Sequence, residues 1–121
     1  MKPDTALPKL RKICLALPEV VETVTFGNPT FKAGKRTFVV LDKYKGEYAI
    51  AFKATLADQT ALTLDPRFYI TPYSGNHGWV SLRLNARMDW EEVGALALMS
   101  YRLVALKRML MLLDQREIAC R

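Results

Sequence analysis

The amino-acid sequence predicts an α+β fold, in which an antiparallel β-sheet meander carries the N- and C-terminal helices on one face. Three observations indicate this class. Apolar residues recur at helical spacing near the start, strand-like alternation fills residues 20–53, and a long helical pattern follows Asp89. No linker or internal repeat divides the chain, so residues 1–121 are predicted to form a single domain. Because 50% of the residues are hydrophobic, this domain can bury a core without disulfide or metal crosslinks.

The first predicted element is a helix that begins at Asp4, whose side chain can cap it, and ends before Pro18. A proline pushes the preceding residue out of the helical region, which stops the helix there. One apolar stripe, spaced by three or four residues, is expected to face the core. It consists of Leu7, Leu10, Cys14 and Leu17.

Residues 20–53 predict a meander of up to four antiparallel strands. The first strand covers residues 20–26 and is followed by a turn at residues 27–29. Further turns are expected around Gly34 and Gly46, since glycine favours hairpin connections. In the last strand of the meander, alternate residues are predicted to face the core. These are Tyr48, Ile50 and Phe52.

After the meander, residues 54–65 predict a short helix and residues 79–84 another strand. Alternation in that strand predicts Val80, Leu82 and Leu84 in the core. It also predicts that Trp79, Ser81 and Arg83 face outward.

Asp89 is predicted to cap the last long helix, with Glu92 in the position that completes a capping box. One apolar face of this helix consists of Trp90, Val93, Ala97, Tyr101 and Val104. Beyond Ala105 two geometries stay open: the helix continues, or it restarts at a new angle.

The net charge of +6 and the isoelectric point near 9.5 favour polyanionic partners, DNA among them. Basic residues gather at the predicted hairpins and on the outer strand face, where the Trp79 indole offers a stacking surface. The candidate nucleic-acid contacts are Lys32, Lys35, Arg36, Lys43, Lys45, Lys53 and Arg83. The alternative is structural, because charged hairpins also keep sheet edges from pairing with other chains.

Catalytic chemistry has little support in the sequence. No nucleophile-elbow, phosphate-loop or zinc-protease motif occurs, and His77 is the only histidine. A third hypothesis, an acid/base enzyme using His77, requires a carboxylate or hydroxyl within reach of the imidazole. Cys14 and Cys120 lie too far apart in sequence to suggest a metal or redox motif. We therefore predict no catalytic residue, no metal and no cofactor.

The expected location is the cytoplasm. The two cysteines indicate a reducing compartment, and the first residues lack the apolar core of a signal peptide. Residues 93–113 are apolar, but three cations interrupt them, which argues against a membrane span. These are Arg102, Lys107 and Arg108.

Three segments resemble the YjbR/MmcQ family of small bacterial proteins: ALPEVVETVTFGNPTFKAGKRTFVVL, DPRFYITPYSGNHGWVSLRL and DWEEVGALALMSYRLVALKRM. They cover roughly residues 10 to 110 in the family's order, and residues 77–82 and 100–105 are the most specific. The motif residues are Tyr73, Gly75, His77, Gly78, Trp79, Tyr101 and Arg102.

This resemblance implies a fold similar to that of bacterial frataxin (CyaY-like) and a DNA-binding role, because the family is commonly described so. Frataxin's iron binding is not carried over, since it relies on an acidic first helix. The present helix has Lys9, Arg11 and Lys12 instead. Many relatives have a proline where this chain has Leu106. The apolar run at residues 109–113 can pack on the core or join two copies, so we expect a monomer or a weak homodimer.

Two function hypotheses follow. The first is a non-enzymatic DNA-binding protein of weak sequence specificity that uses the basic hairpins. The alternative is a protein- or small-ligand-binding domain whose pocket is lined by residues 69–79, with Tyr73, His77, Trp79 and Arg102 in one cleft. Within that loop, Asn76 and His77 are expected to donate hydrogen bonds and Trp79 to cover it. Its glycines are expected to permit a tight path into the strand.

Overall fold

The structure, a computed structural model, describes residues 2–119 and has the predicted α+β architecture. Its six-stranded antiparallel sheet has the order β1-β2-β3-β4-β6-β5. The strands are β1 (Val20–Thr25), β2 (Asn28–Ala33), β3 (Arg36–Tyr44), β4 (Glu47–Phe52), β5 (Phe68–Ile70) and β6 (Val80–Arg83). The helices are α1 (Pro3–Cys14), α2 (Leu56–Leu62), the 3-10 turn η1 (Gly75–His77), α3 (Trp90–Val104) and α4 (Lys107–Ala119).

The N-cap of helix α1 lies two residues earlier than predicted, at Lys2 instead of Asp4. Lys2 is the N-cap residue and makes no side-chain cap, while Pro3 occupies the first turn, where its fixed φ suits a helix. Asp4 lies in that first turn, a favourable place for a negative charge near the helix N-terminus. The helix ends at Cys14, so Leu17 packs against the core from outside it.

The meander has the four predicted strands, but its first turn is shifted by one residue. Phe26 and Gly27 form a two-residue turn between Thr25 and Asn28, so Asn28 and Pro29 already belong to β2. Such a turn needs positive φ at both central positions, and these are 51° for Phe26 and 80° for Gly27.

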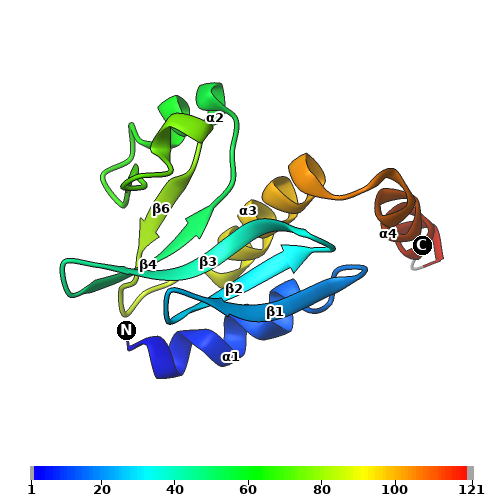
Figure 1. The fold of residues 1–121 in the computed structure, drawn as a ribbon, viewed down its shortest axis with the longest axis horizontal. Helices are drawn as coiled ribbons and strands as arrows, with labels where there is room; N and C mark the ends of the chain where they lie inside the picture. The colour runs from blue at the N-terminus through cyan, green and yellow to red at the C-terminus, as the bar shows by residue number, and fades with distance from the viewer. Residues whose placement is uncertain (1, 120–121) are drawn as a thin grey trace.

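One face of the sheet carries the core. In Figure 1, α1 and α3 lie on the same side of strands β1–β3, and the sheet twists so that β4 and β6 extend upward from β3. Ile50, Val80 and Leu82 are fully buried in the core, as predicted. Tyr48 and Leu84 are only half-buried because Tyr48 lies near the start of β4 and Leu84 lies one residue beyond β6.

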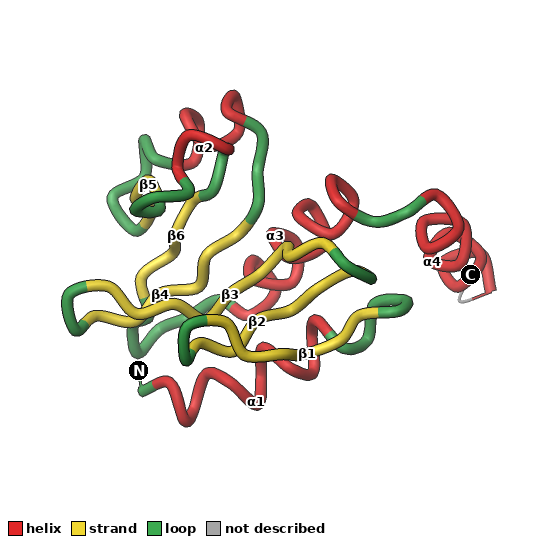
Figure 2. The backbone as a smooth tube through the Cα atoms, viewed as in Figure 1, coloured by secondary structure: helices red, strands yellow, loops and turns green. Residues whose placement is uncertain are grey.

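Strand β5 was not predicted from the sequence. It is three residues long and pairs with β6 at the sheet edge (Figure 2). A three-residue strand shows too little alternation to distinguish it from a loop.

The last helical segment breaks at Ala105, although no proline is present. Ala105 has an extended backbone with ψ of 146°, and α4 restarts at Lys107. Met109 and Leu113 are buried against the core, so α4 packs on its own chain through these residues. Arg108 connects α4 to Glu19, the residue before β1, through an ion pair at 2.9 Å.

Candidate functional site: the open face of the sheet

The face of the sheet opposite α1 and α3 carries a mixture of small, polar and aromatic side chains. Directly paired residues of an antiparallel sheet point to the same side. The register therefore aligns one row across the open face. It consists of Thr30, Val40, Ala51, Ser81 and Tyr69. Their sequence neighbours Phe31, Leu41 and Ile50 belong to the core on the opposite side.

A cavity of about 480 Å³ lies on this open face. Thr30, Val40 and Ala51 belong to the row that forms its floor, and Phe26 lines it from the β1–β2 turn. The segment at residues 71–74 and the Trp79 side chain line it from β5 and β6. Its size lies within the range of about 300–1,000 Å³ that is typical of small-molecule sites.

Asp42 is the one charged residue among the described residues that line the cavity. Its Oδ1 accepts hydrogen bonds from the Asn28 amide at 3.1 Å and from the Lys43 backbone N–H at 2.9 Å. Within residues 2–119, Oδ2 has no hydrogen-bond donor. The cavity therefore contains an ordered carboxylate that can still accept a hydrogen bond.

The loop at residues 71–79 is held by Gln59 of α2, a residue that sequence reasoning did not select. The buried Gln59 amide donates to the Gly75 carbonyl at 2.7 Å and to the Trp79 carbonyl at 2.8 Å. Thr71 and Ser81 are joined through their hydroxyl oxygens at 2.8 Å. Ser81 lies on the face opposite the core, as predicted, and it is nevertheless fully buried there.

The two motif glycines are required by close packing. A Cβ atom on Gly78, whose φ is 92°, would lie 2.0 Å from the Ala54 carbonyl oxygen. A Cβ on Gly75 would lie 2.3 Å from the Ile70 side chain. The expectation that glycines permit this tight path is therefore confirmed.

Contrary to the prediction, the side chains of His77 and Asn76 do not hold the loop. Both are exposed, and no hydrogen bond of the His77 imidazole or the Asn76 amide occurs in the described part of the chain. His77 contributes through its backbone: its N–H donates to the Ser74 carbonyl, and its carbonyl accepts from the Lys53 ammonium. Acid/base chemistry would require a carboxylate or hydroxyl bonded to the His77 imidazole. Within residues 2–119, no such hydrogen bond occurs.

The predicted pocket residues do not share one cleft. Tyr73 and Trp79 line the open-face cavity, whereas His77 lines a separate depression with Lys53 and Leu103. Arg102 lines neither and lies 3.5 Å from Asp114. Tyr101 is fully buried, and its hydroxyl donates to the Pro18 carbonyl at 2.7 Å.

The predicted basic contacts also divide into groups. The register places Lys32 and Arg83 on the open face, and the Lys45 ammonium lies 5.4 Å from the Tyr44 ring centroid at its margin. Lys43 points to the helix-bearing side, where it lies over the Tyr48 ring at 5.4 Å. Two others, Lys35 and Arg36, lie at the opposite end of β3 from Lys45. Lys53 is engaged by the His77 carbonyl.

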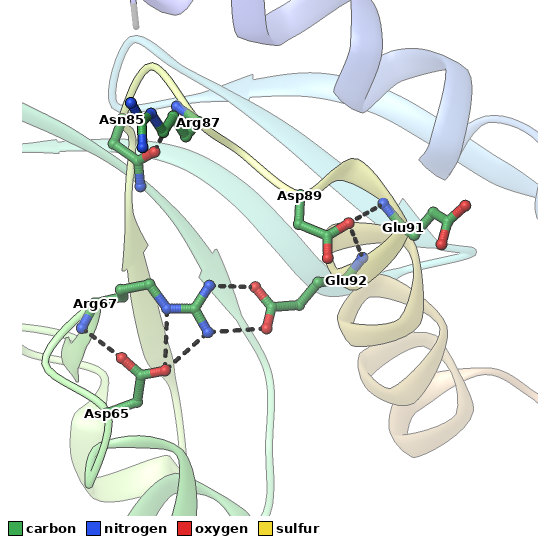
Figure 3. Close-up of polar contacts among 7 residues, drawn as sticks. All are labelled: Asp65, Arg67, Asn85, Arg87, Asp89, Glu91 and Glu92. Atoms are coloured by element: carbon green, nitrogen blue, oxygen red, sulfur yellow. Dashed lines mark hydrogen bonds and ion pairs between the residues drawn. The ribbon is translucent and has the colours of Figure 1, made fainter.

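A second polar cluster joins β5 to the start of α3 (Figure 3). The Arg67 guanidinium donates to Asp65 Oδ2 at 2.8 Å and to Glu92 Oε1 at 2.8 Å. Hydrogen bonds from Arg67 lower the pKa of Asp65, and the two carboxylates raise the pKa of Arg67.

Asp89 caps α3 as predicted, accepting from the Glu91 and Glu92 backbone N–H groups. The Glu92 side chain reaches Arg67 instead of closing the capping box.

Neither a metal centre nor a membrane span is found in the described chain. No group of three His, Cys, Asp or Glu residues within residues 2–119 lies close enough to hold a metal ion. Among the helices of the same range, none combines the length and hydrophobicity needed to cross a bilayer.

Comparisons with known proteins agree with the predicted resemblance. The chain matches the family model described as YjbR over residues 15–103. A comparison with curated proteins gives no match. Among solved structures, the fold is similar to the crystal structure of a Deinococcus radiodurans protein described as a DUF419 domain. The TM-score is 0.70 at 25% identity, over 84% of this chain and 79% of the other. Since the family model spans most of the sequence, the chain belongs to the YjbR family.

Proposed function

We propose that the protein is a non-enzymatic nucleic-acid-binding domain that binds single strands with weak sequence preference through the open face of its sheet. The observation that carries this proposal is the combination of exposed aromatic rings with cations on a face that α1 and α3 leave uncovered. Proteins that bind single strands combine stacking surfaces for the bases with positive charge for the phosphates. The family's description as DNA-binding points in the same direction.

Cations and rings are already in contact on this face. The Arg83 guanidinium lies 4.6 Å from the Tyr69 ring centroid. Lys45 lies over the Tyr44 ring, which in turn meets the Tyr73 ring edge-on at 6.5 Å. A strand crossing this face would meet stacking surfaces between Lys45 and Arg83. Arg83 Nη1 donates to the Pro66 carbonyl at 2.6 Å, and its other guanidinium N–H groups and the Lys45 ammonium can approach phosphate oxygens.

The geometry favours a single strand over a duplex gripped by two hairpin turns. The turns that carry Lys35 and Lys45 lie at opposite ends of β3, which is nine residues long. At about 3.4 Å per residue they are roughly 30 Å apart. Because this separation exceeds the roughly 12 Å width of the major groove of DNA, the two turns cannot enter one groove side by side.

The test is a titration of a labelled single strand and of its duplex at about 50 and 200 mM salt. Three phosphate contacts, by Lys32, Lys45 and Arg83, predict a slope of log affinity against log salt of about −2 for the single strand. Affinity should then fall roughly 20-fold over this range. Absence of measurable single-strand binding at the lower salt overturns the proposal, as does equal or tighter binding of the duplex.

Matched variants locate the surface. Lys45→Gln with Arg83→Gln should reduce the salt slope to about −0.7, because one contact would remain. The control is Lys35→Gln with Arg36→Gln, which removes the same charge at the other end of β3 and should leave the slope near its original value. A larger effect of the control pair would place the contact elsewhere.

A further inference from the structure

The two most exposed aromatic side chains flank the same cavity. Phe26 is 99% exposed and Tyr73 is 95% exposed, and both line the hollow on the open face. Burying such a ring ordinarily stabilises a fold by about 1.5–3 kcal/mol, which neither residue contributes. Their positions are therefore not explained by packing of the core.

Both residues also adopt a backbone conformation that their side chains disfavour. The φ angle is 51° at Phe26 and 67° at Tyr73. A bulky side chain in this left-handed region is an outlier, and asparagine or glycine would fit with less strain. An exposed ring held in a strained conformation at the rim of a cavity points to a binding role.

The charge of the cavity indicates what kind of group it accepts. Asp42 supplies its one charge among the described lining residues, and its Oδ2 is available as an acceptor. A phosphate would be repelled here, whereas an N–H donor would be attracted. A planar ring with an exocyclic amino group satisfies both requirements, since it stacks on aromatic faces and donates to a carboxylate.

We propose that this cavity binds one amino-bearing nucleobase, stacked against Phe26 or Tyr73 and hydrogen-bonded through its amino group to Asp42. The base belongs to a single strand whose phosphates contact the basic margin of the face, and in this respect the inference rests on the proposed function. A free nucleoside has the same ring chemistry, so the experiment separates the two sources.

The direct readout is the fluorescence of Trp79, which lines the cavity. The chain has two tryptophans, so Trp90→Phe leaves Trp79 as the reporter. The probes are oligo(dC), oligo(dT) and free deoxycytidine. Oligo(dC) should change the Trp79 emission and bind about tenfold more tightly than oligo(dT), which has no exocyclic amino group.

Three variants test the contacts. Asp42→Asn keeps the size of the side chain and should abolish the preference for oligo(dC) over oligo(dT). Phe26→Asn and Tyr73→Asn should each lower the affinity for oligo(dC) about tenfold, while thermal stability stays the same or rises. Leu64→Asn is the control, because Leu64 is 84% exposed and lies outside the cavity lining.

The outcomes separate this inference from the proposed function. Retained oligo(dC) preference in Asp42→Asn, or affinities of the Phe26 and Tyr73 variants equal to that of Leu64→Asn, overturns the cavity assignment. The salt-dependent strand binding would still stand in that case. Tight binding of free deoxycytidine that Lys45→Gln with Arg83→Gln does not weaken would support the base site in the cavity. It would also show that the bound base comes from a free nucleoside and not from a strand.

Discussion

Tyr101 illustrates how a single residue connects distant parts of this fold. Its side chain is fully buried on α3, and its ring meets Phe38 of β3 edge-on with centroids 5.6 Å apart. Its hydroxyl donates to the carbonyl of Pro18, 83 residues earlier in the chain. A buried hydroxyl needs such a partner, so Tyr101 fixes the segment between α1 and β1 against the last long helix. Its role in the family motif is therefore structural.

Gly78 provides a sharp test at the residue scale. Gly78→Ala should lower the free energy of unfolding by at least about 2 kcal/mol, because the new methyl group would collide with a backbone carbonyl and φ is positive. The measurement is urea denaturation followed by far-ultraviolet circular dichroism.

The matched control for this substitution is Gly94→Ala. Gly94 lies within α3, and a Cβ atom there would meet nothing within 4 Å. Alanine is favoured over glycine in a helix interior, so this variant should gain up to about 1 kcal/mol of stability. Equal effects at the two positions would contradict the packing explanation.

At the scale of elements, the short helix α2 supports the loop that shapes the open face. Thr55 caps α2 by accepting from the Asp58 backbone N–H at 3.1 Å. Gln59 then projects from the helix to the two carbonyls of the loop. The helix is only seven residues long, so tertiary contacts account for its stability more than helix propensity does.

Gln59→Leu tests this support. The Gly75 and Trp79 carbonyls would each lose one donor and keep a backbone one, from Gly78 at 3.0 Å and from Thr71 at 3.3 Å. At about 0.5–1.5 kcal/mol for each lost hydrogen bond, the variant should lose about 1–3 kcal/mol of stability. It should also alter the emission of Trp79, whose carbonyl Gln59 holds. Thr60→Ala on the same helix removes an exposed hydroxyl and should cost under about 1 kcal/mol. Native-like Trp79 emission in Gln59→Leu would show that the loop does not depend on α2.

At the scale of the molecule, ion pairs connect segments that are distant in sequence. Glu19 binds Arg108 of α4, and Arg67 near β5 binds Glu92 of α3. Hydrogen bonds from Arg108 lower the pKa of Glu19, as those from Arg67 lower that of Asp65. Since these groups are at least partly solvent-exposed, each pair alone contributes little to stability.

These shifts predict a pH dependence. A carboxyl whose pKa is lowered by folding contributes stability above its unfolded pKa and loses it as pH falls through the folded value. The melting temperature should therefore begin to fall below about pH 4.5, near the ordinary pKa of glutamate. Glu19→Gln with Asp65→Asn should flatten this fall, whereas Glu47→Gln, at the β3–β4 turn, should not. An equally steep fall in the double variant would exclude these two pairs as its cause.

Local patterns in the sequence were sufficient for the class of fold. The spacing of Leu10 and Cys14 identified α1, alternation through Ile50 and Phe52 identified the inner face of β4, and Asp89 marked the start of α3. Each of these signals arises from backbone geometry within a few residues, so it can be detected without knowledge of the rest of the chain.

Only the tertiary structure determined how the open face is built. Phe26, Asp42 and Gln59 come from a turn, a strand and a short helix, and no spacing in the sequence relates them. The break at Ala105 and the burial of Ser81 likewise depend on what packs beside them. The sequence alone therefore determined the main helices up to Ala105, the meander and the family. The cavity required the fold, because the register of strands and the contacts of a distant helix decide which side chains share one surface.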